Sequence, residues 1–188
     1  MGLTSSLPGK LSEEQLEEYL QLTYLSRNDI LILLKKIMTI NPCHENLNPN
    51  YRFQFEAIVE LLPQLKYNPF RDRLLRVFSS EQDDLLSFED VLDLCSVMSE
   101  NCPYEVKARW AFHIYDFNED GSIDGEDIEI IIGRLTNGKI NNDVDKKHIV
   151  QVLLEAINLQ KNGSINQLEF EHAIGKMPDF VSTFSFKI

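Results

Sequence analysis

The sequence of 188 residues predicts an all-α fold with two lobes, each built from a pair of helix–loop–helix units. The main observation is a frame of twelve residues that occurs twice, as DFNEDGSIDGED at 116–127 and NLQKNGSINQLE at 158–169. Both copies have Gly at the sixth place, Ser and Ile after it, and an acidic residue at the twelfth. Apolar residues on both sides of each copy recur with the spacing of one helix face. These faces are Ala108, Ala111, Phe112 and Tyr115, then Ile128, Ile131, Ile132 and Leu135, then Val150, Leu153, Leu154 and Ile157, and finally Phe170, Ala173, Ile174 and Met177.

The first copy of the frame is typical of a loop that surrounds a divalent cation. Such a loop supplies oxygen ligands at places 1, 3, 5, 7, 9 and 12, and Gly at place 6 makes the sharp turn. Here the ligand places hold Asp116, Asn118, Asp120, the carbonyl of Ser122, Asp124 and Asp127. The pattern indicates an EF-hand ion site, with an acidic surface turn as the competing interpretation.

The twelfth place of this loop bears on which ion binds. A Glu there would reach Ca²⁺ with both oxygens, whereas Asp127 is one methylene shorter and offers one oxygen. The resulting six-fold shell suits Mg²⁺ better than Ca²⁺. We therefore expect Mg²⁺ in this loop under resting conditions and Ca²⁺ with moderate affinity.

The second copy keeps the frame and loses the charge. Its ligand places hold Asn158, Gln160, Asn162, the carbonyl of Ser164, Asn166 and Glu169. Neutral amides bring no charge to offset the removal of water from a divalent cation, and Lys161 adds a positive charge nearby. We expect weak or absent ion binding here, and a structural role in which Ile165 pairs with Ile123 of the first loop.

Two more degenerate copies precede these. The segment 79–90 keeps apolar flanks, but Ser79 occupies place 1 and Asp84 replaces the turn Gly. A looser copy has a long loop containing Pro42 and Pro49 and no ligand pattern. Its flanking faces are Ile30, Leu33, Leu34 and Ile37, then Ile58, Leu61 and Leu62.

The repeated frame predicts a division of the chain into three segments. Residues 1–25 form an N-terminal segment and an amphipathic helix, which Ser12 and Gln15 begin with a capping box. Residues 26–100 form an N-lobe with two degenerate hands. Residues 104–188 form a C-lobe with the third and fourth hands and a C-terminal tail.

Composition excludes several other classes of protein. A net charge of -12 disfavours binding to nucleic acid, which requires Lys and Arg to neutralise phosphates. The three cysteines follow no disulfide or zinc spacing, and with no leader we expect a reduced, cytoplasmic protein. No apolar run reaches the roughly 20 residues of a membrane span. No catalytic constellation is present, so an enzyme is not expected.

Several stretches resemble the calcium- and integrin-binding (calmyrin) family of EF-hand proteins over nearly the whole chain. They are EEYLQLTYLSRNDIL near the start, NPFRDRLLRVFS, LSFEDVLDLCSVMSE, AFHIYDFNEDGSID, and the ending PDFVSTFSFKI, which is most like the second and third vertebrate members. The resemblance implies Asp at place 12 of the third loop, as found at Asp127. It also implies an acid-rich fourth loop, and Asn158, Gln160 and Asn162 depart from this.

The resemblance further implies a partner. Family members bind a helical cytoplasmic segment of a membrane protein, such as an integrin tail or a transmembrane-channel-like mechanotransduction channel. An apolar groove would accept such a helix through anchors at i, i+3 or i+4 and i+7. The candidate groove residues are Ile131, Leu135, Ile149, Leu153, Phe170, Ile174, Phe180 and Phe184. Each of them could instead be core. The tail is too apolar for a free terminus, so we expect it to pack in or beside the groove and to shift when a partner enters.

The N-terminal sequence MGLTSS fits a myristoylation signal with Gly2 as the acceptor. A single acyl chain binds membranes only marginally, so stable residence at the cytoplasmic face of the plasma membrane would require the protein partner. Two alternatives to the adaptor role remain open. One is an EF-hand regulatory subunit of a phosphatase or kinase, and the other is a calcium buffer, which a single good ion site disfavours.

Overall fold

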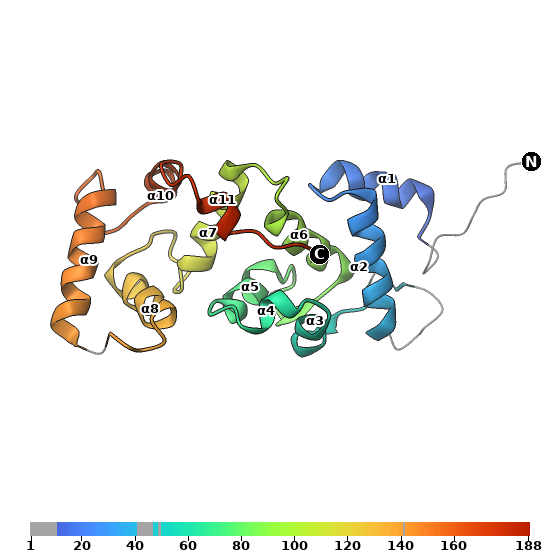
Figure 1. Ribbon diagram of the computed structural model, residues 1–188, viewed down its shortest axis with the longest axis horizontal. Helices are drawn as coiled ribbons and strands as arrows, with labels where there is room; N and C mark the ends of the chain where they lie inside the picture. The colour runs from blue at the N-terminus through green and yellow to red at the C-terminus, as the bar shows by residue number, and fades with distance from the viewer. Residues whose placement is uncertain (1–10, 41–46, 49, 141) are drawn as a thin grey trace, which may run out of the picture. The chain divides into compact units, whose positions relative to one another are not determined.

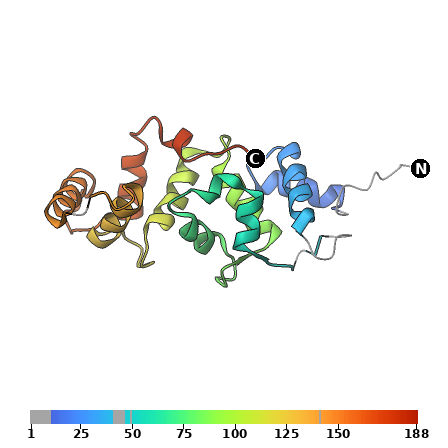
Figure 2. The same cartoon turned by 60° about the horizontal axis from the view of Figure 1, so that its bottom comes forward.

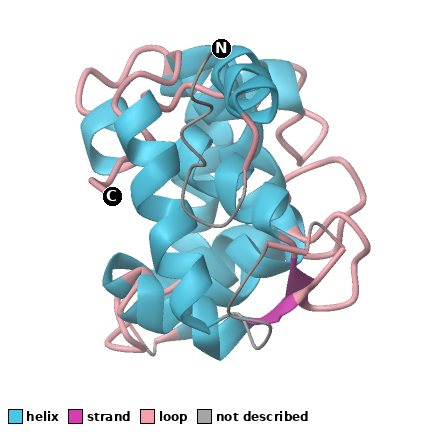
Figure 3. Cartoon of the chain, turned by 90° about the vertical axis from the view of Figure 1, so that its right-hand side faces the viewer, coloured by secondary structure: helices cyan, strands magenta, loops and turns pink. Residues whose placement is uncertain are grey.

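A computed structural model describes the chain except for residues 1–10, 41–46, 49 and 141. The regular structure of the described part is helical apart from one short two-stranded ladder (Figure 3). This confirms the predicted all-α class. The contacts divide the chain into two units, Met1–Cys102 with Ser185–Ile188, and Pro103–Phe184.

The N-terminal unit contains six helices and two strands among its described residues (Figure 1). They are α1 (Glu13–Leu22), α2 (Arg27–Ile40), β1 (Phe53–Gln54), α3 (Phe55–Leu61), α4 (Pro63–Lys66), α5 (Arg71–Phe78), β2 (Leu85–Leu86) and α6 (Phe88–Met98). The predicted face of α2 is buried along its whole length, at Ile30, Leu33, Leu34 and Ile37. Pro42 and Pro49, in the predicted long loop of the first hand, lie outside the described residues.

Side-chain caps set the starts of two of these helices. The Ser12 hydroxyl accepts a hydrogen bond from the Gln15 N–H, and the Gln15 side chain accepts one from the Ser12 N–H, which is the predicted capping box of α1. The same reciprocal pair begins α6, with Ser87 and Asp90. Leu16, near the start of α1, and Phe88, the first residue of α6, are almost completely buried. Both helices therefore contact the core close to their capped ends.

The C-terminal unit contains α7 (Tyr104–Tyr115), α8 (Gly125–Leu135), α9 (Asp143–Ile157), α10 (Gln167–Ile174) and the short α11 (Phe180–Thr183). Helices α7 and α10 pack together, α8 packs on α9, and α11 lies against α7 (Figure 1). The buried core residues of this unit are Ala111, Phe112, Ile123, Ile128, Ile132, Ile165 and Phe170. Three residues of the predicted faces are exposed: Met177, because α10 ends at Ile174, Leu153 on α9, and Leu135 at the last position of α8.

Helix α9 is the longest described helix of this unit, yet none of its fifteen residues is fully buried. Figure 2 shows it in orange at the end of the C-terminal unit, beside α8. Ile149, Val150, Leu154 and Ile157 are only partly buried where they pack against the core. The apolar surface of α9 is therefore incompletely covered within this unit.

The last four residues belong to the N-terminal unit. The Phe186 N–H donates to the Met98 carbonyl over 3.0 Å, and the Gln64 side chain donates to the Lys187 carbonyl over 2.6 Å. The sequence pattern predicted that the whole tail belongs to the C-lobe. The assignment differs because these contacts are made through the tail's backbone, which carries no sequence pattern.

Candidate metal centre and helix-binding surface

The loop 116–127 has a backbone bent at two defined points. Gly121, at place 6, has a φ of 84°, and Glu119, at place 4, has a φ of 58°. The fourth-hand loop repeats both bends at Lys161 and Gly163, with φ of 55° and 90°. A side chain at place 6 would be disfavoured by this φ and not by lack of space, since no atom lies within 4 Å of a Cβ built on Gly121.

A short backbone bridge joins the two loops, as predicted. The Ile123 N–H donates to the Ile165 carbonyl over 2.9 Å, and the Ile165 N–H donates back over 2.8 Å. Both isoleucines are buried in the core of the unit. The fourth-hand loop therefore contributes to the shape of the third, whatever ion it binds itself.

Asp116 organises the first half of the loop. Its carboxylate is buried and accepts hydrogen bonds from the N–H groups of Asp120 at 3.2 Å and Gly121 at 2.9 Å. The Asp120 carboxylate accepts from both the hydroxyl and the N–H of Ser122, and these bonds hold its pKa below the usual value. The side chains at places 1 and 5 are thus held by hydrogen bonds on an ordered turn.

Asp127 closes the loop from the first turn of α8. Its carboxylate is 2 % exposed and accepts the N–H groups of Phe117 at 2.9 Å and Asp124 at 3.1 Å. Burial raises the pKa of Asp127, with further contributions from the charges of Asp124 and Asp116, and the two N–H bonds only partly oppose this. A divalent cation in the loop would favour the ionised form and offset that cost.

The donor set of this loop fits a hard cation, which takes oxygen ligands of mixed type. Among the described residues, no three Asp, Glu, His or Cys side chains are gathered into a preformed metal cluster. The four predicted carboxylates of this loop are among the described residues, and the structure does not gather three of them into such a cluster. The ligand assignment at Asp116, Asp120, Asp124 and Asp127 remains a prediction.

The fourth-hand loop has one carboxylate and one unsatisfied amide. Burial acts to raise the pKa of Glu169, but N–H bonds from Asn166, Gln160 and Leu159 outweigh it, and the pKa lies below its usual value. At place 1, the buried Asn158 Oδ1 has no hydrogen-bond partner among the described residues. A buried acceptor without a partner is costly, so a water molecule or a weakly held cation would be favoured there.

The residues predicted to line a helix-binding groove fall into three groups. Phe170 is buried in the core, so its ring is not available as a lining residue. Ile149, Ile174, Phe180 and Phe184 are partly buried against that core. Ile131 is intermediate in exposure, while Leu135 is 63 % and Leu153 is 37 % exposed. The last two belong to α8 and α9, which pack together.

One residue that orders the tail was missed in the sequence. Lys107 on α7 is completely buried, and its Nζ donates to the Phe184 carbonyl over 3.0 Å. The available signal was its position, since Lys107 lies four residues before Ala111 on the predicted apolar face of the helix.

Comparison with known proteins agrees with this architecture. A family model described as an EF-hand domain pair matches residues 105–175. Over 94% of its length the chain is 36% identical to the rat and human proteins called calcium and integrin-binding family member 2, and 34% identical to the fruit fly protein of that name. In each case 96% of the relative is covered.

The paired loops, their bends and the bridge between them define an EF-hand protein. Similarity at this level over nearly the full length of both chains is specific to one group within that class. The chain belongs to the calcium and integrin-binding family. None of the helices in the part of the chain that the structure describes combines the length and apolar composition needed to cross a membrane.

We expect Asn158→Asp to strengthen ion binding in the fourth-hand loop. The new carboxylate adds the missing charge at place 1 opposite Glu169, and it also gives the buried position a group that a cation satisfies. Calorimetric titration with Ca²⁺ should show a second site, with an affinity at least about tenfold above that of the original loop. The exposed Asn162→Asp is the matched control and should have a smaller effect. An unchanged titration for Asn158→Asp would contradict this account.

Proposed function

We propose that this protein is a non-enzymatic EF-hand adaptor that binds Ca²⁺ or Mg²⁺ and holds a helical cytoplasmic segment of a membrane protein. The names of its relatives describe calcium and integrin binding, and an EF-hand pair is a binding module. The observation that carries the proposal is the half-buried tail, because its aromatic residues lie on the C-terminal unit as a bound amphipathic helix would.

The tail packs on the C-terminal unit through the short helix α11. Phe180 begins α11 and Phe184 is its C-cap residue, and their rings are stacked at a centroid distance of 5.3 Å. Both rings pack against the core while remaining partly exposed. The Lys107 bond to the Phe184 carbonyl fastens the end of this helix to α7. An amphipathic partner helix presents the same chemistry, with apolar anchors spaced by one turn.

The C-terminal unit has further apolar side chains for a partner to cover. In the described residues of the C-terminal unit, Ile130 and Leu135 on α8 and Val152 and Leu153 on α9 are all exposed. Because α9 buries no residue fully, it can adjust at small cost in packing. We infer that these helices and the site vacated by α11 form the helix-binding surface.

A divalent ion in loop 116–127 would stabilise the helices α7 and α8 on either side of the loop. Asp116, Asn118, Asp120, Asp124 and Asp127, with the carbonyl of Ser122, would hold it. Its charge would offset the repulsion between carboxylates and fix the angle between α7 and α8. With Asp127 at place 12, Mg²⁺ would be the resting ion, and Ca²⁺ would bind with moderate affinity.

The proposed partner is a cytoplasmic helix of an integrin or of a transmembrane-channel-like channel, and the site of action is the cytoplasmic face of the plasma membrane. Gly2 lies outside the described residues. Its myristoylation would add marginal membrane affinity to that of the partner. Intact-mass measurement after co-expression with the acyltransferase should show the added acyl chain, and an unmodified mass would remove this part of the proposal.

The central experiment is a binding titration with synthetic tail peptides of an integrin and a channel. We expect binding in Mg²⁺ or Ca²⁺, and binding at least about tenfold weaker in chelator or in the Asp116→Asn variant. A peptide with the same composition and a scrambled apolar spacing is the control. Equal affinity for the scrambled peptide, or preferential capture of a phosphatase catalytic chain, would overturn the adaptor role in favour of its alternative.

The tail should compete with the partner. Lys107→Met removes the donor to the Phe184 carbonyl, which costs about 1–3 kcal/mol. If the tail must leave first, its release raises the fraction of open surface, and partner affinity should rise by about tenfold or more. Truncation before Pro178 should do the same. Exposed Lys176→Met is the control. Unchanged affinity and folding after truncation would show that the tail has no part in binding.

Place 12 should determine ion preference. Asp127→Glu provides the second oxygen of a seven-fold shell, so Ca²⁺ affinity should rise and Mg²⁺ affinity should fall, each by about tenfold. The neighbouring Glu126→Asp changes length by the same methylene on an exposed residue and should leave both affinities unchanged. Competition titrations of the two ions measure the ratio. A ratio unmoved by Asp127→Glu would exclude Asp127 as the selecting ligand.

A further inference from the structure

The degenerate loop 79–90 retains the backbone of an ion-binding loop. Gln82 at place 4 and Asp84 at place 6 have φ of 54° and 60°, the same two bends that Glu119 and Gly121 make in the third hand. Asp84 adopts this conformation without being glycine, which costs an L-residue about 1–2 kcal/mol. The segment has therefore kept an ion-loop shape at a cost, although Ser79 lacks the carboxylate usual at place 1.

Two further features match the third hand. The β1–β2 ladder pairs Phe53 with Leu86 at place 8, as Ile123 pairs with Ile165 in the C-terminal unit. Ser87 and Asp90 form a capping box at places 9 and 12, as Asp124 and Asp127 do. By this register, Arg52 is at place 7 of the first hand, directly before the ladder.

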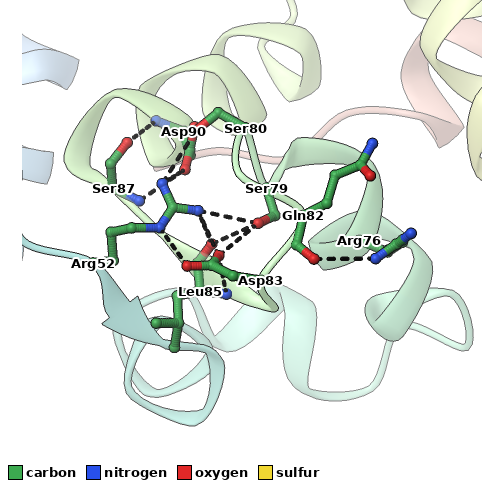
Figure 4. Close-up of polar contacts among 9 residues, drawn as sticks. All are labelled: Arg52, Arg76, Ser79, Ser80, Gln82, Asp83, Leu85, Ser87 and Asp90. Atoms are coloured by element: carbon green, nitrogen blue, oxygen red, sulfur yellow. Dashed lines mark hydrogen bonds and ion pairs between the residues drawn. The ribbon is translucent and has the colours of Figure 1, made fainter.

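The Arg52 side chain reaches into the loop of the second hand. Figure 4 shows its guanidinium at the centre of the group of oxygens that the loop turns inward. Its hydrogen bonds are to Asp83 Oδ1 at 2.7 Å and Oδ2 at 2.9 Å, the Leu85 carbonyl at 2.8 Å, Ser79 Oγ at 3.1 Å, Ser80 Oγ at 3.1 Å and Asp90 Oδ2 at 3.3 Å. Four of these residues stand at places 1, 5, 7 and 12, where an ion loop carries ligands.

We propose that the guanidinium of Arg52 takes the place of the divalent cation in loop 79–90 and holds this loop in its ion-loaded shape. The first hand, which has lost its own ligands, would supply the cation for the second. The N-terminal unit would then keep its shape at any concentration of Ca²⁺, and ion sensing would be confined to the C-terminal unit.

The chemistry of arginine suits this role. A guanidinium is always charged at physiological pH and has five N–H donors in a plane, so it can satisfy several oxygens at once. The side chain of Arg52 is only 17% exposed and that of Asp90 only 6%. The hydrogen bond from Arg52 is the largest cause that lowers the pKa of Asp83, to about 2. The pair is therefore fully charged wherever the protein works, and it would be lost only as the pH falls from about 4 towards 2.

An ordinary surface ion pair is the competing interpretation. Such a pair joins one cation to one carboxylate, whereas Arg52 also bonds the Leu85 carbonyl and two hydroxyls. The carbonyl at place 7 is the backbone ligand of an ion loop. Contacts of this kind indicate a cation at the centre of the loop and not one on its surface.

A pair of variants tests whether the two cations exclude each other. Ser79→Asp restores the carboxylate at place 1, and Arg52→Gln removes the guanidinium at nearly unchanged polarity. We expect the double variant to bind one more Ca²⁺ than the unmodified protein. Ser79→Asp alone should bind none in this loop, because Arg52 still fills it. Calorimetry counts the sites, and the amide resonances of residues 79–90 locate the additional ion.

Arg52→Gln alone provides the second measurement. Loop 79–90 should lose amide-exchange protection by at least about tenfold without Ca²⁺, and high Ca²⁺ should restore part of it. Arg76→Gln is the matched control, since Arg76 also donates to this loop, to the Gln82 carbonyl at 3.2 Å, but lies away from the oxygens that Arg52 contacts (Figure 4). It should not make protection depend on Ca²⁺.

Three results would overturn the proposal. They are an additional ion in Ser79→Asp alone, no additional ion in the double variant, and unchanged protection in Arg52→Gln. If Arg52→Gln folds only in Ca²⁺, the proposal is supported, because an external ion then replaces the internal one. These measurements are made on loop 79–90, so failure of the proposed adaptor function would not affect them.

Discussion

The fold depends on the pairing of ion-type loops through a short backbone ladder. Each described pair has one: Phe53 with Leu86 in the N-terminal unit, and Ile123 with Ile165 in the C-terminal unit. The ladder requires both loops to have nearly the same shape, because the paired residues stand at the same place in each frame. A loop can therefore lose its ion without losing its geometry, provided that its partner loop and its bends remain.

A loop of this shape gathers oxygens, and gathered oxygens require a positive charge or must be reduced in number. The loops at 79–90, 116–127 and 158–169, which the structure describes in full, show three solutions to this constraint. Loop 116–127 keeps its carboxylates, whose repulsion a divalent ion would offset. Loop 158–169 replaces most of them with amides and retains only Glu169, held by backbone N–H groups. Loop 79–90 receives the guanidinium of Arg52. Because of these differences, one frame can serve two roles, and we propose an ion sensor in the C-terminal unit and a fixed scaffold in the N-terminal unit.

Much of this could be read from the sequence, because local rules govern it. The Gly at place 6, the helix faces around each loop, the pairing of Ile123 with Ile165 and the capping box at Ser12 all depend on residues close together in the chain. The described structure has each of them. The predicted groove was less successful. Phe170 proved to be core, and only some of the remaining residues are exposed, because the spacing of apolar residues does not show which side of a helix its neighbours leave open.

The sequence by itself determined the class of fold, the frame of the loops and the family, since these rest on short-range spacing and on similarity along the whole chain. Only the tertiary structure decided where the charged groups of Arg52 and Lys107 lie. Both are long, flexible side chains whose partners lie far away in sequence, at residues 79–90 and at Phe184. Their positions depend on which backbone carbonyls and carboxylates the packed helices bring within reach, and no local pattern records that.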